Sequence, residues 1–399
     1  MPKEYSPFTP GQPVPLEFFV GRQREVSVLT ESAAVAARGR LQVGFLCGER
    51  GIGKSSLASF ARFVAERDHR VLGLHTFLGG VLSLEEMVRR VFDRLLKESI
   101  DKPWHAEVRK FFGNHIRKVG LFGVSLEFGA PQDDLRRMVH DFAPALRNLI
   151  HRLAEQKDAV FLVLDDINGL AESADFANWL KSLVDEIATS REALPLSLLL
   201  VGLEQRRQAL VSLQPSLGRV FDVIEIAPWS SQETRDFYQN AFSKEGVAVD
   251  PEALDVLVRY AGGLPVLAHE IGDAAFKTDG DNRIDRHDAL AGVVGAADIV
   301  GRKLLEPQVF KAIRSARYRA ILRKAAREPF EFSFKRRELL RRLTEAEKKV
   351  LDNFLNRMKR LGVVRQDPEA GPGAYQFTNQ LHFLYFWLEA EHARERAEP

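Results

Sequence analysis

The chain has 399 residues, 45% of them hydrophobic and 28% charged, which is the balance of a globular protein with room for two or three domains. The formal net charge of +2 excludes a uniformly basic protein that binds polyanions over its whole surface. The charge is uneven, however. Residues 301–399 hold 22 lysines and arginines against 13 aspartates and glutamates, so an acidic partner would meet this part of the chain.

The single cysteine, Cys47, leaves no internal disulfide framework and suits a reducing compartment. We expect it to be a packed strand residue rather than a reactive thiol. No stretch approaches the roughly 18 apolar residues of a membrane-spanning helix, and the proline-rich N-terminus lacks the apolar region of a secretory signal. These features predict a cytoplasmic protein without a membrane partner.

Residues 1–17 carry five prolines, which predicts an extended N-terminal segment. Residues 18–25 then read Phe-Phe-Val-Gly-Arg-Gln-Arg-Glu and lead into a helical pattern. This stretch resembles the F-x-G-R-x-x-E box of initiator-type AAA+ and STAND ATPases, which packs on adenine. The resemblance makes Phe19, Val20 and Gly21 candidates for the base pocket; a simple turn and helix cap is the alternative.

An apolar run at residues 41–47 predicts a buried strand, and the eight residues after it fit the phosphate-loop pattern G-x-x-x-x-G-K-[ST]. Glycines let backbone N–H groups surround phosphate oxygens, and the following helix N-terminus adds positive charge. We expect Lys54 to reach the β- and γ-phosphates and Ser55 to ligate Mg²⁺. The alternative is a chance glycine turn with a solvated lysine. The predicted contacts to nucleotide are Gly48, Glu49, Arg50, Gly51, Ile52, Gly53, Lys54, Ser55 and Ser56.

A second strand is predicted at residues 71–77, followed by a capped helix at 83–96. Residues 100–130 are less clear: 104–119 could form a basic amphipathic helix, and 124–128 alternate as a strand does. We assign no chemistry to this insertion. A long helix is predicted at 133–155.

Residues 159–164 are wholly apolar, as in a central parallel strand covered on both faces, and Asp165 and Asp166 follow directly. Ligands of open α/β sheets bind at the carboxyl ends of the strands. We therefore predict a Walker B pair, in which Asp165 binds Mg²⁺ through water and Asp166 orients and deprotonates the attacking water. Aspartates that merely end a strand are the alternative.

Another buried strand is predicted at 195–202, but no polar sensor ends it, and Glu204 is only a weak candidate. The last core strand is predicted at 217–226. Arg219 stands where many AAA+ ATPases carry an arginine finger that reaches a neighbour's nucleotide. Arg206 and Arg207 are alternative fingers, and a surface salt bridge is the alternative role for Arg219.

Helices are predicted from Ser230 to Lys244 and from Asp250, and the turn at 262–265 reads Gly-Gly-Leu-Pro. This turn resembles the G-x-P motif of the STAND lid, which implies that Pro265 lies near the nucleotide. Initiator lids carry an arginine about here, where this chain has Val266. We expect His269 to be a packed helix residue rather than a phosphate contact.

The basic C-terminal part predicts helices at 319–327, at 335–340 and from Thr344, then a hairpin of 363–366 with 375–377. Three helices and a hairpin are the order of a winged helix. Its exposed basic helix could bind duplex DNA, or the domain could pack against protein with a solvated charged face. The apolar residues 381–388 are expected to pack within this domain.

Together these motifs resemble those of P-loop ATPases of the AAA+/STAND type, including origin-recognition-like and archaeal-type ATPases with a C-terminal winged helix. The expected fold is α/β: a P-loop parallel sheet core, an α-helical lid and a winged-helix domain. The expected boundaries are 1–17 for the extended segment, 18–228 for the core, 229–308 for the lid and 309–399 for the winged helix.

ATP is favoured over GTP because no N-K-x-D guanine motif occurs. The leading hypothesis is an ATPase switch that assembles on nucleic acid, with self-association. The alternatives are a STAND-like signalling ATPase with slow hydrolysis and only protein partners, and a small-molecule kinase.

Overall fold

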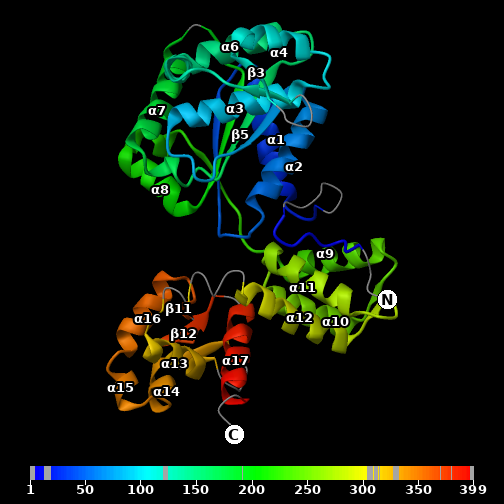
Figure 1. The fold of residues 1–399 in the computed structure, drawn as a ribbon, viewed down its shortest axis with the longest axis vertical. Coiled ribbons are helices and arrows are strands. Elements are labelled where there is room, and N and C mark those ends of the chain that lie inside the picture. The colour runs from blue at the N-terminus through cyan, green and yellow to red at the C-terminus, as the bar shows by residue number, and fades with distance from the viewer. Residues whose placement is uncertain are drawn as a thin grey trace. The chain divides into compact units, whose positions relative to one another are not determined.

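A computed structural model describes residues 5–12, 19–119, 125–190, 192–302, 315–326, 332–368, 370–378 and 380–395, with the single residues 309 and 313. The chain divides into two compact units. One comprises residues 13–227. The other comprises residues 228–399 together with residues 1–12, so the chain begins in the second unit (Figure 1).

The first unit is built on a five-stranded sheet in which every neighbouring pair is parallel. The strand order is β2-β5-β6-β1-β7, so the first strand after the N-terminus lies inside the sheet. The three inner strands are buried almost throughout, which explains their continuous apolar sequences. The strands are β1 (Gln42–Cys47), β2 (Val71–Phe77), β5 (Ala159–Asp165), β6 (Leu196–Gly202) and β7 (Asp222–Glu225).

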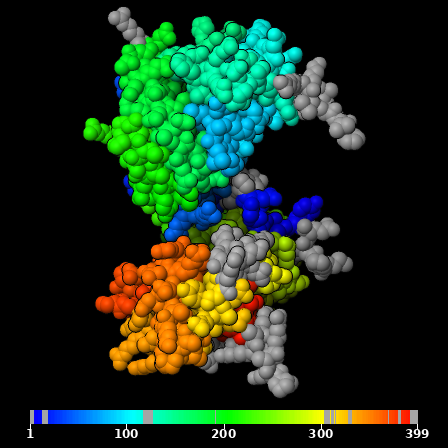
Figure 2. Space-filling view, turned by 60° about the vertical axis from the view of Figure 1, so that its left-hand side comes forward, coloured from blue at the N-terminus to red at the C-terminus, as the bar shows by residue number. Residues whose placement is uncertain are grey.

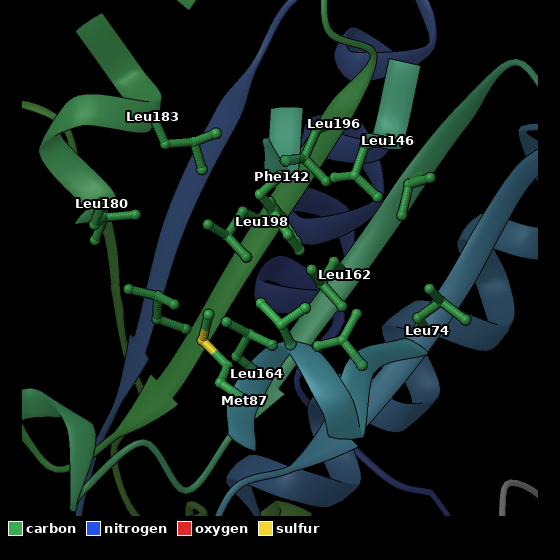
Figure 3. Packing of buried hydrophobic residues seen from close by; sticks show 14 of the residues in the cluster. Leu74, Met87, Phe142, Leu146, Leu162, Leu164, Leu180, Leu183, Leu196 and Leu198 are labelled. Carbon is green, nitrogen blue, oxygen red and sulfur yellow. The ribbon is translucent and has the colours of Figure 1, made fainter. Parts of the chain in front are cut away.

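Helices cover both faces of this sheet. On one face, Leu162 of β5 and Leu198 of β6 pack in one cluster with Phe142 and Leu146 (Figure 3). On the other face, the hydroxyls of Ser32 and Ser197 lie 2.9 Å apart and join a helix to β6. The helices of this unit are α1 (Gln23–Ala37), α2 (Lys54–Asp68), α3 (Leu84–Ser99), α4 (His105–Phe112), α5 (Gln132–His140), α6 (Phe142–Arg152), α7 (Ala174–Thr189) and α8 (Glu204–Leu213).

The prediction of one long helix at 133–155 is wrong. The structure has two helices there, α5 and α6, which meet at Asp141. Pro144 gives the reason. In the middle of a continuous helix its ring would clash with the carbonyl of His140. In the first turn of α6 the missing N–H costs nothing.

The predicted helix at 104–119 is also too long. It ends at Phe112, where Gly113 adopts a positive φ of 53°, and a short strand, β3 (Ile116–Val119), follows. This strand pairs antiparallel with β4 (Ser125–Phe128), which confirms the strand predicted there. The last core strand begins at Asp222 rather than at 217, since Pro215–Arg219 form a 3₁₀ turn.

The second unit starts with four helices, and the starts predicted for the first two, at Ser230 and Asp250, are confirmed. Ser230 and Glu233 form a capping box, and Pro251 and Pro265 occupy the first position of their helices. A two-residue strand just before α10, β8 (Ala248–Val249), pairs in parallel with a two-residue strand just before α12, β9 (Arg283–Ile284). The helices are α9 (Ser231–Lys244), α10 (Pro251–Ala261), α11 (Pro265–Thr278) and α12 (Arg286–Val300).

The C-terminal part of this unit has its own apolar core, and much of its surface is seen in orange in Figure 2. Three short strands form an antiparallel sheet of order β10-β12-β11, of which β10 was not predicted. The last helix packs on α12 and α13. In chain order the elements are α13 (Ala316–Ala325), β10 (Ser333–Lys335), α14 (Arg336–Arg341), α15 (Glu345–Lys348), α16 (Leu351–Arg360), β11 (Val364–Gln366), β12 (Ala374–Phe377) and α17 (Gln380–Glu395).

The capping box of Thr344 and Glu347 is confirmed, but the single helix predicted after it is not. The N–H of Val350 donates to the carbonyl of Glu347, three residues back. This tight turn ends α15, and α16 begins at Leu351.

Candidate nucleotide site

The loop between β1 and α2 has the backbone of a phosphate cradle. Gly48, Gly51 and Gly53 all have positive φ angles, of 155°, 75° and 91°. A Cβ on Gly48 would lie 2.9 Å from the carbonyl oxygen of Ile226, so a side chain does not fit there. The buried Ile52 anchors the loop, while Glu49 and Arg50 point to solvent.

Lys54 is the first residue of α2, and Ser55 and Ser56 follow in the same turn. The Lys54 amine donates to the carbonyl of Gly48, at 3.0 Å, and to the carbonyl of Glu49, at 2.7 Å. Burial lowers the pKa of Lys54, against the attraction of Asp165 and, more weakly, of Asp166. The amine therefore lies over the loop and within the field of both carboxylates.

Strand register explains why the loop and the two aspartates come together. Asp165 is paired with Val201 of β6, and Val201 is paired on its other side with Leu46 of β1. Asp165 is therefore level with the end of β1, two strand spacings or roughly 10 Å away. The phosphate loop and the acidic strand end share the carboxyl edge of one sheet.

Asp165 has a partner that the sequence did not suggest. Nε2 of His75, on the neighbouring strand β2, lies 2.9 Å from Oδ2 of Asp165, and both side chains are buried. The carboxylate can only accept, so His75 donates. The imidazole also stacks on Phe77, with 4.6 Å between ring centroids. A polar His-Thr pair inside an otherwise apolar strand was the available signal.

Asp166 is held differently. It is exposed and has a φ of 57°, a left-handed conformation that is uncommon outside glycine. The amide of Asn168 donates to its carboxylate. A Cβ on Gly79 would lie 2.9 Å from Asp166 Oδ2, so Gly79 leaves the space that this carboxylate occupies. Strained backbone of this kind is concentrated at functional sites.

The donor set fits a magnesium ion that is shared with phosphate. In the described part of the chain, no group of three or more His, Cys, Asp or Glu side chains could hold a metal ion. Mg²⁺ does not need such a cage, because it usually takes one or two carboxylates plus phosphate oxygens and water. Asp165 offers one buried carboxylate for such an ion, and Ser55 stands half-buried in the first turn of α2.

The predicted base box begins with an aromatic pair. Phe19 stacks on Phe60 of α2 with 4.2 Å between ring centroids and an angle of 7°. Val20 and Gly21 follow, half-buried, and α1 begins two residues later. Pro265, which the resemblance to the lid motif predicts to lie near the nucleotide, belongs to the other unit, as the buried first residue of α11.

Of the candidate arginines, two are engaged within the unit. Arg206 forms an ion pair with Glu172, and Arg207 forms one with Glu204. Arg219 is exposed at the end of the 3₁₀ turn, and it has no ion pair among the residues that the structure describes. The salt bridge considered for Arg219 is therefore not found in this part of the chain.

Glu204, the weak sensor candidate, is occupied by local contacts. Its pair with Arg207 lowers the pKa of Glu204 to about 2. Burial, with a hydrogen bond to Glu204, raises the pKa of the Cys47 thiol to about 12. Cys47 is thus a buried protonated thiol, as expected for a packed strand residue.

Comparisons with known proteins agree with this geometry. Residues 19–211 match the family model of the AAA ATPase domain. The chain is similar to the Walker-type ATPase PABY2304 of Pyrococcus abyssi, with 17% identity, 92% of this chain and 96% of that chain covered, and a TM-score of 0.56. It is also similar to the ORC2 protein of Aeropyrum pernix, in a structure of ADPNP–ADP complexes, with 13% identity, coverage of 99% and 97%, and a TM-score of 0.59.

At these identities the two structures establish a shared fold and nothing finer. A comparison with curated proteins found no match. None of the helices in the described ranges combines the length and apolarity needed to cross a bilayer.

Proposed function

Taking residues 19–211 as a P-loop ATPase domain of the AAA+ type, we propose that the chain is a molecular switch that binds and hydrolyses ATP and couples its nucleotide state to a partner. The observation that carries this proposal is the convergence of Lys54 and Asp165 at one edge of the sheet. A cation on a phosphate loop opposite a buried carboxylate is the arrangement that a metal-bound triphosphate requires.

Each of the residues at this carboxyl edge of the sheet then has a role. Lys54 and the N–H groups of the loop bind the β- and γ-phosphates, while Ser55 and Asp165 hold Mg²⁺, directly and through water. The ion, when bound, neutralises charge that develops on the transferred phosphoryl group. His75 orients Asp165, and Asp166 orients and deprotonates the attacking water.

Adenine would be bound by Phe19, Val20 and Gly21, with the Phe19–Phe60 pair as its apolar wall. Pro265 at the start of α11 would approach the nucleotide when a helical lid, residues 229–308, closes on the core, residues 18–228. Arg219 would reach the nucleotide of a neighbouring copy, a role that its exposure supports.

The partner proposed for the C-terminal domain, residues 309–399, is duplex DNA. The order of its elements, from α13 through the three-stranded sheet, supports the proposal that this domain is a winged helix. An open groove between α13 and α16 is lined by the exposed Arg317, Arg357 and Arg360, with the amides Asn353 and Asn356 beside them. In the described part of the chain these arginines form no ion pair, so they remain available to phosphates.

One observation favours the second candidate, a signalling ATPase that binds only protein. Some of the positive charge of this domain is neutralised internally, because Arg336 pairs with Asp352, Lys324 with Glu347 and Lys348 with Glu345. Nucleotide-dependent self-association without affinity for DNA would support that candidate.

Duplex binding measured by fluorescence anisotropy, with ATP and across a range of salt concentrations, separates the two candidates. We expect the double variant Arg357→Ala/Arg360→Ala to bind more weakly and to lose roughly two units of the slope of log affinity against log salt. The matched control Arg341→Ala/Arg342→Ala removes the same charge outside the groove and should bind as the wild type does. Equal binding by both variants, or no binding in either nucleotide state, would contradict the DNA proposal. Phosphate release from ATP alone would exclude a kinase that needs an acceptor.

A further inference from the structure

The N-terminal residues 5–12 belong to the second unit, the helical unit of residues 1–12 and 228–399. In the sequence, the ATPase core of residues 13–227 separates them from the rest of that unit. Their anchor is Phe8, which is only 3% exposed. The centroid of its ring lies 5.7, 6.1 and 5.0 Å from the ring centroids of Phe237, Tyr238 and Phe242 on α9. The ring centroid of His269 on α11 is 6.2 Å away. Phe8 therefore fills a socket between two helices.

The opposite wall of this socket is shaped for the ring. A Cβ on Gly272 of α11 would lie 2.4 Å from the Phe8 ring, so only glycine leaves room for it. Beside the socket, the backbone N–H of Thr9 donates to Nδ1 of His269 at 3.1 Å. The segment is thus positioned both by an aromatic side chain and by a directional backbone hydrogen bond.

The docking is mainly apolar. Three buried polar atoms around the socket, Thr9 Oγ1, Tyr238 OH and His269 Nε2, have no hydrogen-bond partner among the described protein groups. Burying such groups without a protein partner opposes docking. The aromatic contacts of Phe8 must therefore provide most of the stabilisation, and removing this one ring should release the segment.

Docking has a consequence for the connection between the two units. The chain passes from one to the other at residues 227–228, and it also passes between them through residues 13–18, since Gln12 belongs to the helical unit and Phe19 to the core. Seven residue steps can span roughly 25 Å at most. While Phe8 is docked, the two units are joined twice; when it is released, they are joined once.

We propose that residues 5–12 are a strap: Phe8 docks between α9 and α11, and the strap then limits how far the helical unit can move from the ATPase core. A bounded hinge restricts the set of open conformations that a lid can reach and so favours reclosure. This inference rests on the proposed function only in assigning nucleotide as the cause of the movement, and the strap itself can be tested without nucleotide.

Docking is tested by hydrogen exchange on the full-length chain without nucleotide. We expect Phe8→Ala to raise the exchange rates of α9 and α11 amides next to the socket at least tenfold, with α1 and α2 unchanged. The matched control Tyr5→Ala truncates an aromatic residue that is 82% exposed and should exchange as the wild type does. Unchanged exchange at α9 and α11 in Phe8→Ala would overturn the docking.

The limit on movement needs a variant that keeps Phe8. A six-residue Gly-Ser insertion between Val14 and Pro15 lengthens the connection. The same insertion after Gly371, in a turn where a Cβ on that glycine would meet no atom within 4 Å, is the control. Donor and acceptor dyes at Leu213→Cys and Leu290→Cys, both exposed positions, report the distance between the units in single molecules, while the native Cys47 is buried.

We expect the Val14 insertion and Phe8→Ala both to broaden the distance distribution, with the Gly371 insertion unchanged. The Val14 insertion should leave α9 and α11 exchange at the wild-type rate. Identical distributions in all four proteins would overturn the strap, whether or not ATP is hydrolysed. A failure of ATP binding would leave this result intact, so the two proposals fail separately.

Discussion

His75 and Asp165 form a buried pair, with 2.9 Å between Nε2 and Oδ2, across the neighbouring strands β2 and β5. The pair gives the proposed magnesium ligand a single orientation. Partners that orient a ligand in this way typically change metal affinity or activity by 10- to 100-fold when they are lost.

We therefore expect His75→Ala to raise the Mg²⁺ concentration needed for half-maximal ATP hydrolysis by roughly 10- to 100-fold. It should also lower stability by about 1–3 kcal/mol, because a buried carboxylate loses its donor. Hydrolysis measured against Mg²⁺, together with thermal unfolding, checks both effects. His140→Ala, at an exposed histidine, is the control. A wild-type Mg²⁺ dependence in His75→Ala would mean that the pair has no part in the site.

Asp166→Asn separates binding from hydrolysis. Asparagine tolerates the left-handed backbone at this position, so the fold should be kept. Loss of the base should reduce ATP turnover by roughly 10²- to 10⁴-fold, while the affinity for ATP stays within about twofold. Equilibrium binding and phosphate release on the same sample make the comparison. Unchanged turnover would reassign the base.

Arg219→Ala tests whether copies of the chain share sites. Because Arg219 is exposed and forms no ion pair in the described residues, its removal should change stability by less than about 0.5 kcal/mol. ATP turnover should fall by roughly 10³-fold or more, as it does on losing an arginine finger. Arg206→Ala tests the alternative finger beside it and should keep its ATP turnover, because Arg206 is already paired with Glu172.

Mixing gives the decisive result for this residue. Arg219→Ala keeps its own phosphate loop, and Lys54→Ala keeps its Arg219, so a mixed assembly contains complete shared sites. Activity should return when these two inactive proteins are combined. Full activity of Arg219→Ala alone would exclude the finger.

His269 predicts an acid-sensitive strap socket. Burial lowers the pKa of His269 to about 4, although Asp273 one turn away acts in the opposite direction. The neutral ring is thus favoured in the folded unit. Its contribution to the free energy of unfolding is complete above pH 6.5, which is the ordinary pKa of histidine. This stabilisation is lost as the pH falls from about 6.5 to about 4. At 1.36 kcal/mol for each unit of pKa difference, the total loss is about 3 kcal/mol.

Chemical unfolding of the wild type and of His269→Gln at pH 7, 5.5 and 4.5 measures this contribution. Glutamine keeps a hydrogen-bond acceptor for Thr9 but does not titrate in this range. The stability of the wild type should therefore fall faster on acidification than that of the variant. Parallel curves would show that His269 is not the group responsible.

Local sequence was sufficient wherever a short pattern specifies the chemistry. The phosphate loop, the apolar strand ending in Asp165 and Asp166, and the capping boxes at Ser230 and Thr344 were all readable, because each depends on residues within a few positions. Pro144 was a local sign of the break between α5 and α6, but the prediction of one long helix followed the continuous apolar pattern instead.

Long-range pairings were not readable. His75 meets Asp165 only because β2 lies beside β5, and the order of strands in a sheet is not the order in the chain. Phe8 meets α9 and α11 across more than 200 residues, so periodicity carried no signal of its socket, and the proline content of residues 1–17 suggested only an extended segment. Gly272, inside a helix, was the one local sign of a close approach.

The central claim is that Lys54 and Asp165 hold a triphosphate with its magnesium ion, and equilibrium titration of Mg²⁺–ATP by calorimetry tests it most directly. Lys54→Ala should weaken ATP binding by roughly 10- to 100-fold, the value of a hydrogen bond to a charged group. Lys181→Ala, at a surface lysine paired with Asp185, should bind as the wild type does. Equal ATP affinity in the wild type and in Lys54→Ala would contradict the account.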